Sequence, residues 1–237
     1  MSAVHNARDH AVQRMFDRIA GRYDLLNRVI SFRLDKRWRN KVVQAALSDR
    51  SQLILDLGAG TGDLTFAAAG AMPGKGRIIG LDFSWEMLRL AQEKKTSARN
   101  HHKVAFVLGS ALCSPFHDAL FDSVMTAFVL RNVSDLNELF AQAFRVLRPE
   151  GRLVSLDMFP PQRSLFSSLY SFYFYRLVPW IGGLLANDQQ AYRYLSQSVQ
   201  HFHSPETVAG IIEGAGFKRV TIKKFLQGAV CMHVAER

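Results

Sequence analysis

The stretch Leu53–Asp63 constrains the fold more than any other part of this chain. It opens with a run of five mostly apolar residues, typical in length and branching of a strand buried on both faces. Three glycines follow at alternate positions, Gly58, Gly60 and Gly62, and then a helical pattern begins. Glycine lets the chain turn sharply out of a strand and lets a ligand approach the backbone closely. The stretch therefore predicts a strand, a ligand-binding turn and a helix.

Two acidic residues narrow the class of ligand. The glycines are spaced G-x-G-x-G rather than G-x-G-x-x-G as in dinucleotide enzymes, and Asp56 precedes them inside the strand. A carboxylate there would disfavour a pyrophosphate but could hold the ammonium of an amino acid. Asp82 ends the next apolar run, where it could accept hydrogen bonds from a ribose diol. Ammonium and ribose together describe S-adenosylmethionine, although glycines that serve turn geometry alone would also explain the pattern.

Strand-like and helix-like runs alternate through the middle of the chain, which is typical of an α/β fold with a parallel sheet and helices on both faces. The predicted strands are 53–57, 77–82, 104–108, 121–127 and 151–157, and the predicted helices between them are 62–71, 84–95 and 135–147. Ser84 is the predicted cap of the second of these helices. Near the end, a helix over 205–215 precedes strands 218–225 and 229–235. A hairpin through Gln227-Gly228 would place an antiparallel strand in an otherwise parallel sheet.

We expect one domain over residues 1–237, because this length and a hydrophobic content of 48% can bury one large core. Within it we expect a basic helical cap (1–48), a cofactor-binding core (49–158), an aromatic helical insertion (159–203) and a C-terminal helix with a hairpin (204–237).

The N-terminal cap should consist of two helices, 11–20 and 34–47, with Gly21 interrupting the first. It has no obvious place in a parallel sheet, so we expect it to cover the mouth of the domain. Tyr23 and Asp24 would then close a pocket from above. Ordinary turn chemistry between two helices is an equally good explanation of these two residues.

Positive charge is concentrated in the same cap. Residues 1–50 hold eleven Lys and Arg against five Asp, a surplus of six in a chain of net charge +10. A basic face attracts nucleic acid and anionic lipid equally well, so charge alone does not choose between them.

Further polar residues follow the third and fourth strands, where the ligand of such a sheet lies. Ser110 and Ala111 would flank an adenine, although a loop serine is the plainer interpretation of Ser110. Arg131 and Asn132 form a polar pair where a second substrate would meet a sulfonium methyl. A turn asparagine beside a surface arginine would explain that pair equally well.

The insertion carries eight aromatic residues between Phe159 and Trp180. They could wall a pocket for a large apolar substrate, dip into a bilayer surface, or form the core of a helical subdomain. They are not interleaved with Lys and Arg as in a base-stacking platform, and no RNA-binding signature is present, so nucleic acid is not an expected partner.

Other site classes are disfavoured by what the sequence lacks. The histidines have no acidic or cysteine partners at ligand spacing, and Cys113 and Cys231 are the only cysteines, so neither a metal site nor a disulfide framework is expected. The N-terminus has no apolar region typical of a signal peptide. We expect a cytoplasmic protein, at the inner face of the cell membrane if the basic cap binds lipid.

Three blocks of sequence resemble the menaquinone/ubiquinone biosynthesis C-methyltransferases, and the likeness extends over nearly the whole chain. The blocks are Met15–Ala20 with Tyr23-Asp24, Asn27 and Trp38-Arg39; Leu130–Val133 with Arg145–Gly151; and Tyr192–Ser198 with Ala215–Phe217. The glycine turn is common to many methyltransferases, whereas the first two blocks are specific.

This resemblance implies a class I S-adenosylmethionine-dependent methyltransferase fold and methyl transfer to a ring carbon of a polyprenylated quinol. In that family the cofactor contacts fall on the positions occupied here by Thr61, Asp82, Ser110 and Ala111. The Arg131-Asn132 pair would be associated with the ring and its deprotonation. Demethylmenaquinol is favoured over a ubiquinone precursor as acceptor, and peripheral contact with an anionic membrane is expected.

The chain departs from the family pattern at three places: Val129 is bulkier than usual, residues 156–161 read Leu-Asp-Met-Phe-Pro-Pro, and His203 replaces a usual proline. These departures bear on the acceptor rather than on the cofactor. Two alternatives stay open at this point, a methyltransferase for RNA or another small molecule, and a non-catalytic S-adenosylmethionine-binding subunit.

Overall fold

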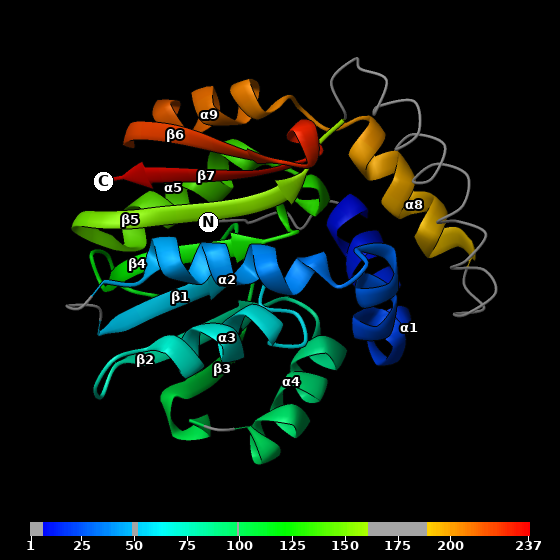
Figure 1. Ribbon diagram of the computed structural model, residues 1–237, viewed down its shortest axis with the longest axis horizontal. Helices are drawn as coiled ribbons and strands as arrows, with labels where there is room; N and C mark the ends of the chain where they lie inside the picture. Colours follow the sequence, from blue (N-terminus) through cyan, green and yellow to red (C-terminus); the bar gives the residue numbers. More distant parts are fainter. Residues whose placement is uncertain (1–6, 49–51, 99, 161–188) are drawn as a thin grey trace.

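The computed structural model describes residues 7–48, 52–98, 100–160 and 189–237. These residues form one seven-stranded sheet with helices on both faces (Figure 1). The strands are β1 (Leu53–Leu57), β2 (Arg77–Asp82), β3 (Val104–Leu108), β4 (Phe121–Ala127), β5 (Leu147–Met158), β6 (Lys218–Phe225) and β7 (Val230–Glu236). The first four match the predicted bounds, and β5 begins four residues earlier than predicted.

The strand order is β3-β2-β1-β4-β5-β7-β6. Strands β1 to β5 pair in parallel, while β7 lies antiparallel between β5 and β6, with Leu153 opposite Ala235. The predicted hairpin is therefore confirmed, and with it the α/β class with a late antiparallel strand. Because the order reverses between β1 and β4, a crevice opens at the carboxyl ends of these two strands, where ligands of such sheets bind.

Seven α-helices belong to the described residues. They are α1 (Ala7–Ile30), α2 (Leu34–Ala46), α3 (Asp63–Ala71), α4 (Trp85–Ser97), α5 (Leu136–Val146), α8 (Gln189–Gln200) and α9 (Pro205–Gly214). Short 3-10 turns include η2 (Leu130–Asn132). Ser84 accepts a hydrogen bond from the N–H of Met87 and so caps α4 as predicted, and Asp135 caps α5 in the same way.

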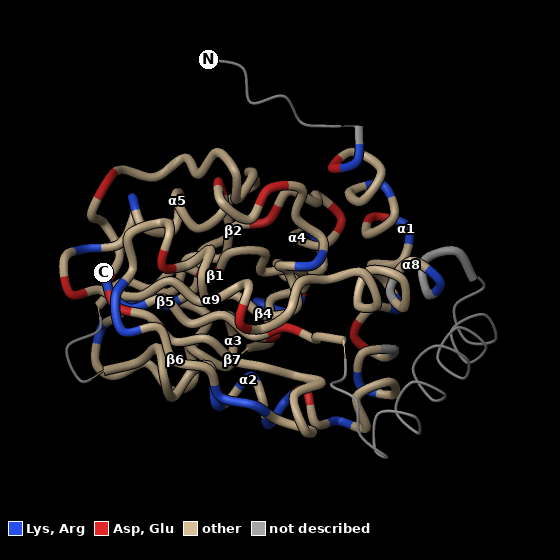
Figure 2. Tube along the Cα trace, turned by 90° about the horizontal axis from the view of Figure 1, so that it is seen from above, with Lys and Arg blue, Asp and Glu red and all other residues tan. Residues whose placement is uncertain are grey.

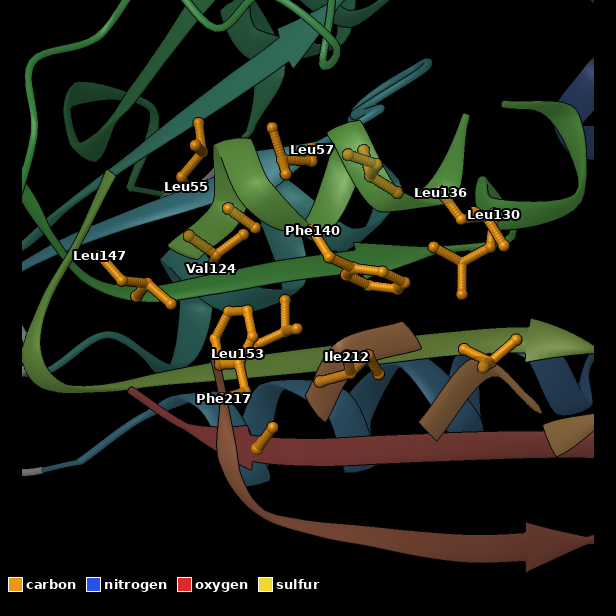
Figure 3. Close-up of a cluster of buried hydrophobic side chains, with 14 of the residues drawn as sticks. Leu55, Leu57, Val124, Leu130, Leu136, Phe140, Leu147, Leu153, Ile212 and Phe217 are labelled. Atoms are coloured by element: carbon orange, nitrogen blue, oxygen red, sulfur yellow. The ribbon is translucent and has the colours of Figure 1, made fainter. Parts of the chain in front are cut away.

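Two apolar cores hold the helices to the sheet. On one face, α5 and α9 pack on the central strands through a cluster that includes Phe140 and Ile212 (Figure 3). On the other face, α2 and α3 pack through Trp38, Val42 and Leu64. Phe140 is 1% exposed and Val42 is fully buried. The sheet is therefore covered on both sides, as its almost continuously apolar strands require.

The first helix differs from the prediction. The sequence suggested a break at Gly21, but α1 runs through it without interruption from Ala7 to Ile30. Gly21 is exposed, and a glycine in an exposed helical position costs only about 1 kcal/mol relative to alanine. Buried Val12, Met15 and Ile30, on either side of the glycine, outweigh that cost. The turn expected at Tyr23 and Asp24 is therefore helix.

Helices α1 and α8 lie on the side of the sheet where β5 has its carboxyl end (Figure 1). Part of the predicted aromatic insertion, residues 161–188, lies outside the described residues, and so do the aromatic residues from Phe166 to Trp180. Phe159 is described and is fully buried. Within the described part of the chain, no helix is long and apolar enough to cross a membrane.

Candidate active site

A pocket of about 780 Å³, partly open to solvent, lies at the carboxyl ends of β1, β2 and β4 beneath α1. Seven of the predicted site residues line it: Tyr23, Gly58, Gly60, Asp82, Ser110, Ala111 and Asn132. The other five are not among the residues that line it: Asp24, Asp56, Thr61, Gly62 and Arg131.

The glycine turn adopts the backbone conformation that its sequence predicts. Gly58, Gly60 and Gly62 all have positive φ, at 73°, 56° and 85°. The N–H groups of Gly58 and Ala59 donate to the carbonyl of Leu81, at 2.8 and 3.0 Å. These amides are thus occupied within the protein, which sets this turn apart from a phosphate-binding loop that offers its N–H groups to the ligand.

Two of the glycines differ in what surrounds them. A Cβ on Gly60 would meet nothing within 4 Å, so the backbone there borders open space in the pocket. A Cβ on Gly58 would lie 2.9 Å from Cγ1 of Val129 and closer still to Cγ2. Val129, the residue that is bulkier than the family pattern, therefore packs directly on the turn and narrows the pocket.

Asp82 connects the turn to the second strand. Its carboxylate accepts hydrogen bonds from the N–H of Gly60 at 2.8 Å and from the N–H of Ser84 at 2.9 Å. Burial raises the pKa of Asp82 to about 6, against the lowering effect of these hydrogen bonds. Each carboxylate oxygen keeps a lone pair for a further donor, so Asp82 can accept from a hydroxyl in the pocket.

Asp56 lies deeper than the sequence suggested. It is 1% exposed, and its Oδ2 accepts the hydroxyl of Thr65 at 2.6 Å. Burial raises its pKa to about 7, while Thr65 and the charge of Arg39 act in the opposite direction. Its Oδ1 has no hydrogen-bond partner. The predicted contact of Asp56 with an ammonium group stays a prediction, since its side chain does not line the pocket.

A polar network fastens the C-terminal half of α1 to the turn. The hydroxyl of Thr61 donates to Asp24 at 2.5 Å. Lys94 on α4 donates to Thr61 at 3.0 Å and to Asp63 at 2.9 Å, and it also forms an ion pair with Asp24. Asp24 therefore fixes the cap rather than facing the pocket, and Thr61 is the residue that joins the cap to the glycine turn.

The predicted Arg131–Asn132 pair divides between wall and interior. Arg131 is 6% exposed and forms a hydrogen-bonded ion pair with Asp157, the penultimate residue of β5. Burial would lower the pKa of Arg131, but the Asp157 carboxylate outweighs burial and raises it. Asn132 lines the pocket, and its Nδ2 donates to the carbonyl of Phe128 at 3.2 Å.

Phe128 stands between two cations at the end of β4. Its φ of 66° is unusual for a bulky residue. The guanidinium of Arg39 lies 5.1 Å from the centre of its ring and that of Arg131 lies 6.0 Å from it. These cation–π contacts favour the strained position, which places Phe128 in the pocket wall.

The sequence did not single out several residues of this site. Asp157 pairs with Arg131, Lys94 holds the cap, and Asp9 of α1 lines the pocket with its Oδ2 accepting the hydroxyl of Ser134 at 2.8 Å. Asp157 ends a buried strand as Asp56 and Asp82 do, so the same signal could have found it. Nothing local marks Lys94 or Asp9, because their partners are distant in sequence. Among the described residues, no group of His, Cys, Asp and Glu is placed to hold a metal ion.

Solved structures identify the fold. A S-adenosylmethionine-dependent methyltransferase from Thermotoga maritima superposes with a TM-score of 0.64 at 18% identity, covering 95% of this chain and 99% of that one. Phosphoethanolamine N-methyltransferase 2 of Haemonchus contortus, in complex with S-adenosyl-L-methionine, gives a TM-score of 0.61 at 15% identity, covering 85% and 52%. The fold is thus the class I fold of S-adenosylmethionine-dependent methyltransferases.

Sequence comparison then identifies the family: the model of the ubiE/COQ5 methyltransferase family matches residues 3–237, and the chain belongs to that family. A demethylmenaquinone methyltransferase of Thermus thermophilus is 42% identical over 94% of this chain and 100% of its own length. One from Lactiplantibacillus plantarum is 38% identical over 94% of each chain. The protein is a methyltransferase whose cofactor is S-adenosylmethionine, as the sequence predicted.

The pocket fits that cofactor. Asp82 offers acceptor oxygens for hydroxyl groups, Gly60 leaves open space beside the turn, and Ser110 and Ala111 line the same pocket after β3. The unpartnered Oδ1 of Asp56 is a further acceptor close behind. The predicted cofactor residues that line the pocket lie on the side formed by β1, β2 and the segment after β3, where S-adenosylmethionine would bind.

Replacing Gly58 with alanine should weaken cofactor binding at least tenfold. The added methyl group would collide with Val129, and the positive φ costs about 1 kcal/mol or more for a residue with a Cβ. Gly58→Ala combined with Val129→Ala should recover part of the loss, because only the backbone cost then remains. Gly70→Ala, in open space on α3, is the matched control. Titration calorimetry gives the affinities, and unchanged binding by Gly58→Ala would contradict this account of the turn.

Cofactor affinity should fall below about pH 6. The raised pKa of Asp82 means that its carboxyl is protonated below that pH and loses acceptor capacity, so affinity is full above about pH 7 and then drops about tenfold per pH unit. Asp82→Asn should bind weakly and lose this dependence. A second step near pH 7, absent in Asp56→Asn, would reveal a contribution of Asp56. Calorimetry across pH 5–8 tests both, and a flat profile for the wild type would refute the assignment of Asp82.

Asp157→Ala should lower the free energy of unfolding by about 3 kcal/mol, because it leaves the buried Arg131 without a counter-charge. The double variant Asp157→Leu/Arg131→Met should recover most of that loss. Asp118→Asn removes a comparable pair with Arg145, but Asp118 is 75% exposed, so less than about 1 kcal/mol should be lost. Urea denaturation measures all three. Equal losses for Asp157→Ala and Asp118→Asn would show that the buried pair is not structurally important.

Proposed function

We propose that the protein methylates a ring carbon of a polyprenylated quinol, with demethylmenaquinol as the favoured acceptor. The observation that carries this proposal is the apolar wall next to the glycine turn, formed by Phe16, Phe128, Val129 and Val133. Such a wall suits an uncharged aromatic acceptor and offers little to a nucleic acid. The names of the Thermus and Lactiplantibacillus relatives support the choice of demethylmenaquinol.

The acceptor ring has to be held and activated. When bound, S-adenosylmethionine supplies a methyl group carried on a positively charged sulfur. A ring carbon becomes nucleophilic once the neighbouring hydroxyl loses its proton. One N–H of the Asn132 amide is held by the carbonyl of Phe128, which leaves its oxygen and second N–H for the ring oxygen. The ring of Tyr23 packs edge-on against that of Phe16, with 5.9 Å between the two ring centroids. Tyr23 lines the pocket and would close it over the acceptor ring.

Arg131 is unsuited to remove a proton itself. Its guanidinium is already paired with Asp157 and its pKa is raised, so it stays charged at any physiological pH. We assign it a positioning role: it holds η2, and therefore Asn132, against the end of β5. Its electrostatic help to a phenolate would be reduced, because the Asp157 carboxylate balances its charge.

Asp9 is the better candidate for the proton acceptor. It and Asp82 are the two acidic residues that line the pocket among the described residues, and Asp82 is committed to the turn. Asp9 is 8% exposed and its Oδ2 is held by Ser134, which leaves Oδ1 for the quinol hydroxyl. In this scheme Asp9 takes the hydroxyl proton. The ring carbon then forms a bond to the methyl group as the bond between methyl and sulfur breaks, with its electron pair left on sulfur. The ring carbon finally loses its own proton to solvent, and the ring oxygen recovers a proton from Asp9.

The test is methyl transfer followed by mass spectrometry, with reduced demethylated naphthoquinol and benzoquinol as acceptors and RNA as the alternative. Asn132→Ala and Asp9→Asn should each lower kcat about 100-fold or more while leaving cofactor affinity unchanged. Asp118→Asn, an exposed acid far from the pocket lining, is the matched control. Transfer to RNA alone would refute the proposed acceptor, and wild-type turnover by both variants would refute the assigned roles.

We also propose that the enzyme meets this acceptor at the cytoplasmic face of the cell membrane, because a polyprenyl tail keeps the quinol in the bilayer. The positively charged cap suits a surface of anionic lipid.

A further inference from the structure

An apolar tip stands out where α1 meets α2. Leu25, Val29 and Phe32 are 56%, 37% and 72% exposed. Leu25 and Val29 lie four residues apart on one side of α1, and Phe32 follows in the turn after its end, where its N–H donates to the carbonyl of Val29 at 3.2 Å. The buried residues of α1, such as Met15 and Ile30, already attach this helix to the fold. The tip is therefore an exposed apolar surface where α1 meets α2, separate from the buried residues that attach the helix to the fold.

The turn that carries Phe32 is held in a strained conformation. Phe32 and Arg33 both have positive φ, at 51° and 63°, which residues with side chains rarely adopt. Backbone hydrogen bonds fix the turn: the N–H of Arg33 donates to Arg28 at 2.9 Å and that of Leu34 donates to Ser31 at 2.9 Å. Strain of this kind in a well-fixed turn is a mark of functional sites.

Charge around the tip is separated by sign. Both acidic residues of the region point inward, since Asp24 is bound to Thr61 and Lys94, while Asp35 is 2% exposed and accepts the hydroxyl of Ser31. Figure 2 shows the basic positions that follow along α2. The exposed basic residues nearest the tip in sequence are Arg22, Arg33, Lys36 and Arg37.

We propose that this tip, consisting of Leu25, Val29 and Phe32 with those four basic residues, docks the enzyme on a bilayer containing anionic lipid. The inference rests on the proposed function, because a quinol with a polyprenyl tail has to be collected from a bilayer. Protruding apolar side chains inside a basic surround match the lipid interface, where apolar groups enter the acyl boundary and Lys and Arg meet anionic headgroups.

The position of the tip on α1 relates docking to the site. The same helix lines the pocket with Phe16 and Tyr23 and carries the tip at its C-terminal end. Tyr23 and Leu25 are two residues apart, which points them to widely separated sides of a helix. Docking through the tip therefore brings the pocket wall formed by α1 close to the lipid surface from which the substrate comes.

Vesicle flotation of the full chain tests the apolar part of the tip. The wild type should float with vesicles containing about 30% phosphatidylglycerol, and far less with phosphatidylcholine alone or as salt rises. The triple variant Leu25→Ser/Val29→Ser/Phe32→Ser should partition at least tenfold more weakly. Leu108→Ser, 53% exposed at the end of β3, controls for the loss of an exposed apolar group. Unchanged flotation of the triple variant would overturn the proposal, provided that thermal unfolding shows it folded.

Charge reversal tests the basic part. Arg33→Glu/Lys36→Glu/Arg37→Glu should weaken flotation on anionic vesicles by about fivefold per residue replaced. Lys75→Glu/Lys218→Glu/Lys223→Glu makes the same change of charge at exposed positions on other elements and is the matched control. Equal losses in both variants would mean that net charge, rather than the tip, governs binding. A wild-type dimer in sedimentation that the serine variant abolishes would identify a second copy of the chain as the true occupant.

The outcome for docking can be separated from that for catalysis. The serine variant should keep wild-type turnover on a quinol analogue without a tail in solution and lose turnover on the tailed quinol in vesicles. Flotation does not depend on turnover, so it decides about the tip even if no quinol is methylated. Wild-type turnover of the serine variant on the vesicle substrate would overturn the tip as the docking surface, whereas inactivity of the wild type on both substrates would count against the proposed function alone.

Discussion

The site depends on a few backbone hydrogen bonds that join the glycine turn to the end of β2. Gly58 and Ala59 donate to the carbonyl of Leu81, and Gly60 donates to the carboxylate of Asp82. These bonds fix the turn against the neighbouring strand. They also explain why glycines occupy the turn. A backbone with positive φ, which glycine tolerates, is needed to point these N–H groups toward Leu81 and Asp82 at the end of β2. The burial that makes Asp82 a good anchor also raises its pKa.

The cap closes this site mainly through polar side chains. Four polar residues along one side of α1 form hydrogen bonds with residues from different segments around the pocket. The pairs are Asp9 with Ser134, Gln13 with the carbonyl of Phe83, Asp17 with Ser84, and Asp24 with Thr61. Each acidic residue of α1 thus forms a hydrogen bond inside the protein, so basic residues dominate the outer surface of this helix. One helix thereby directs its acidic residues toward the protein and carries exposed basic residues on its outer side.

Much of the fold could be predicted because its strands and helix caps follow from short-range sequence patterns. Strands buried on both faces are short apolar runs, and a serine or aspartate before a helix marks its cap, so Ser84 and most strand bounds were found correctly. The fate of Gly21 was not local: its helix continues because distant parts of the fold bury the residues on either side.

The site was predictable to a similar degree. Glycines and an acid at strand ends predicted several residues that line the pocket, and their contacts with the cofactor stay a prediction. The side-chain direction of Asp56 and the partner of Arg131 depend on the pairing of strands and helices far apart in sequence. The same holds for Asp24, whose partners come from the glycine turn and α4. Periodicity and spacing carry no information about such contacts.

The unbroken course of α1 has a mechanical meaning. Twenty-four helical residues extend about 36 Å, and such a rod passes a displacement at one end to the other. Had the chain bent at Gly21, the part that carries Asp9 and Phe16 could shift independently of the part that carries Val29. As one continuous helix, α1 couples a displacement of its C-terminal end to the geometry of the pocket that it covers. Gly21, near the middle of α1, is then the position at which a flexible insertion would interrupt the helix and allow that coupling to be measured.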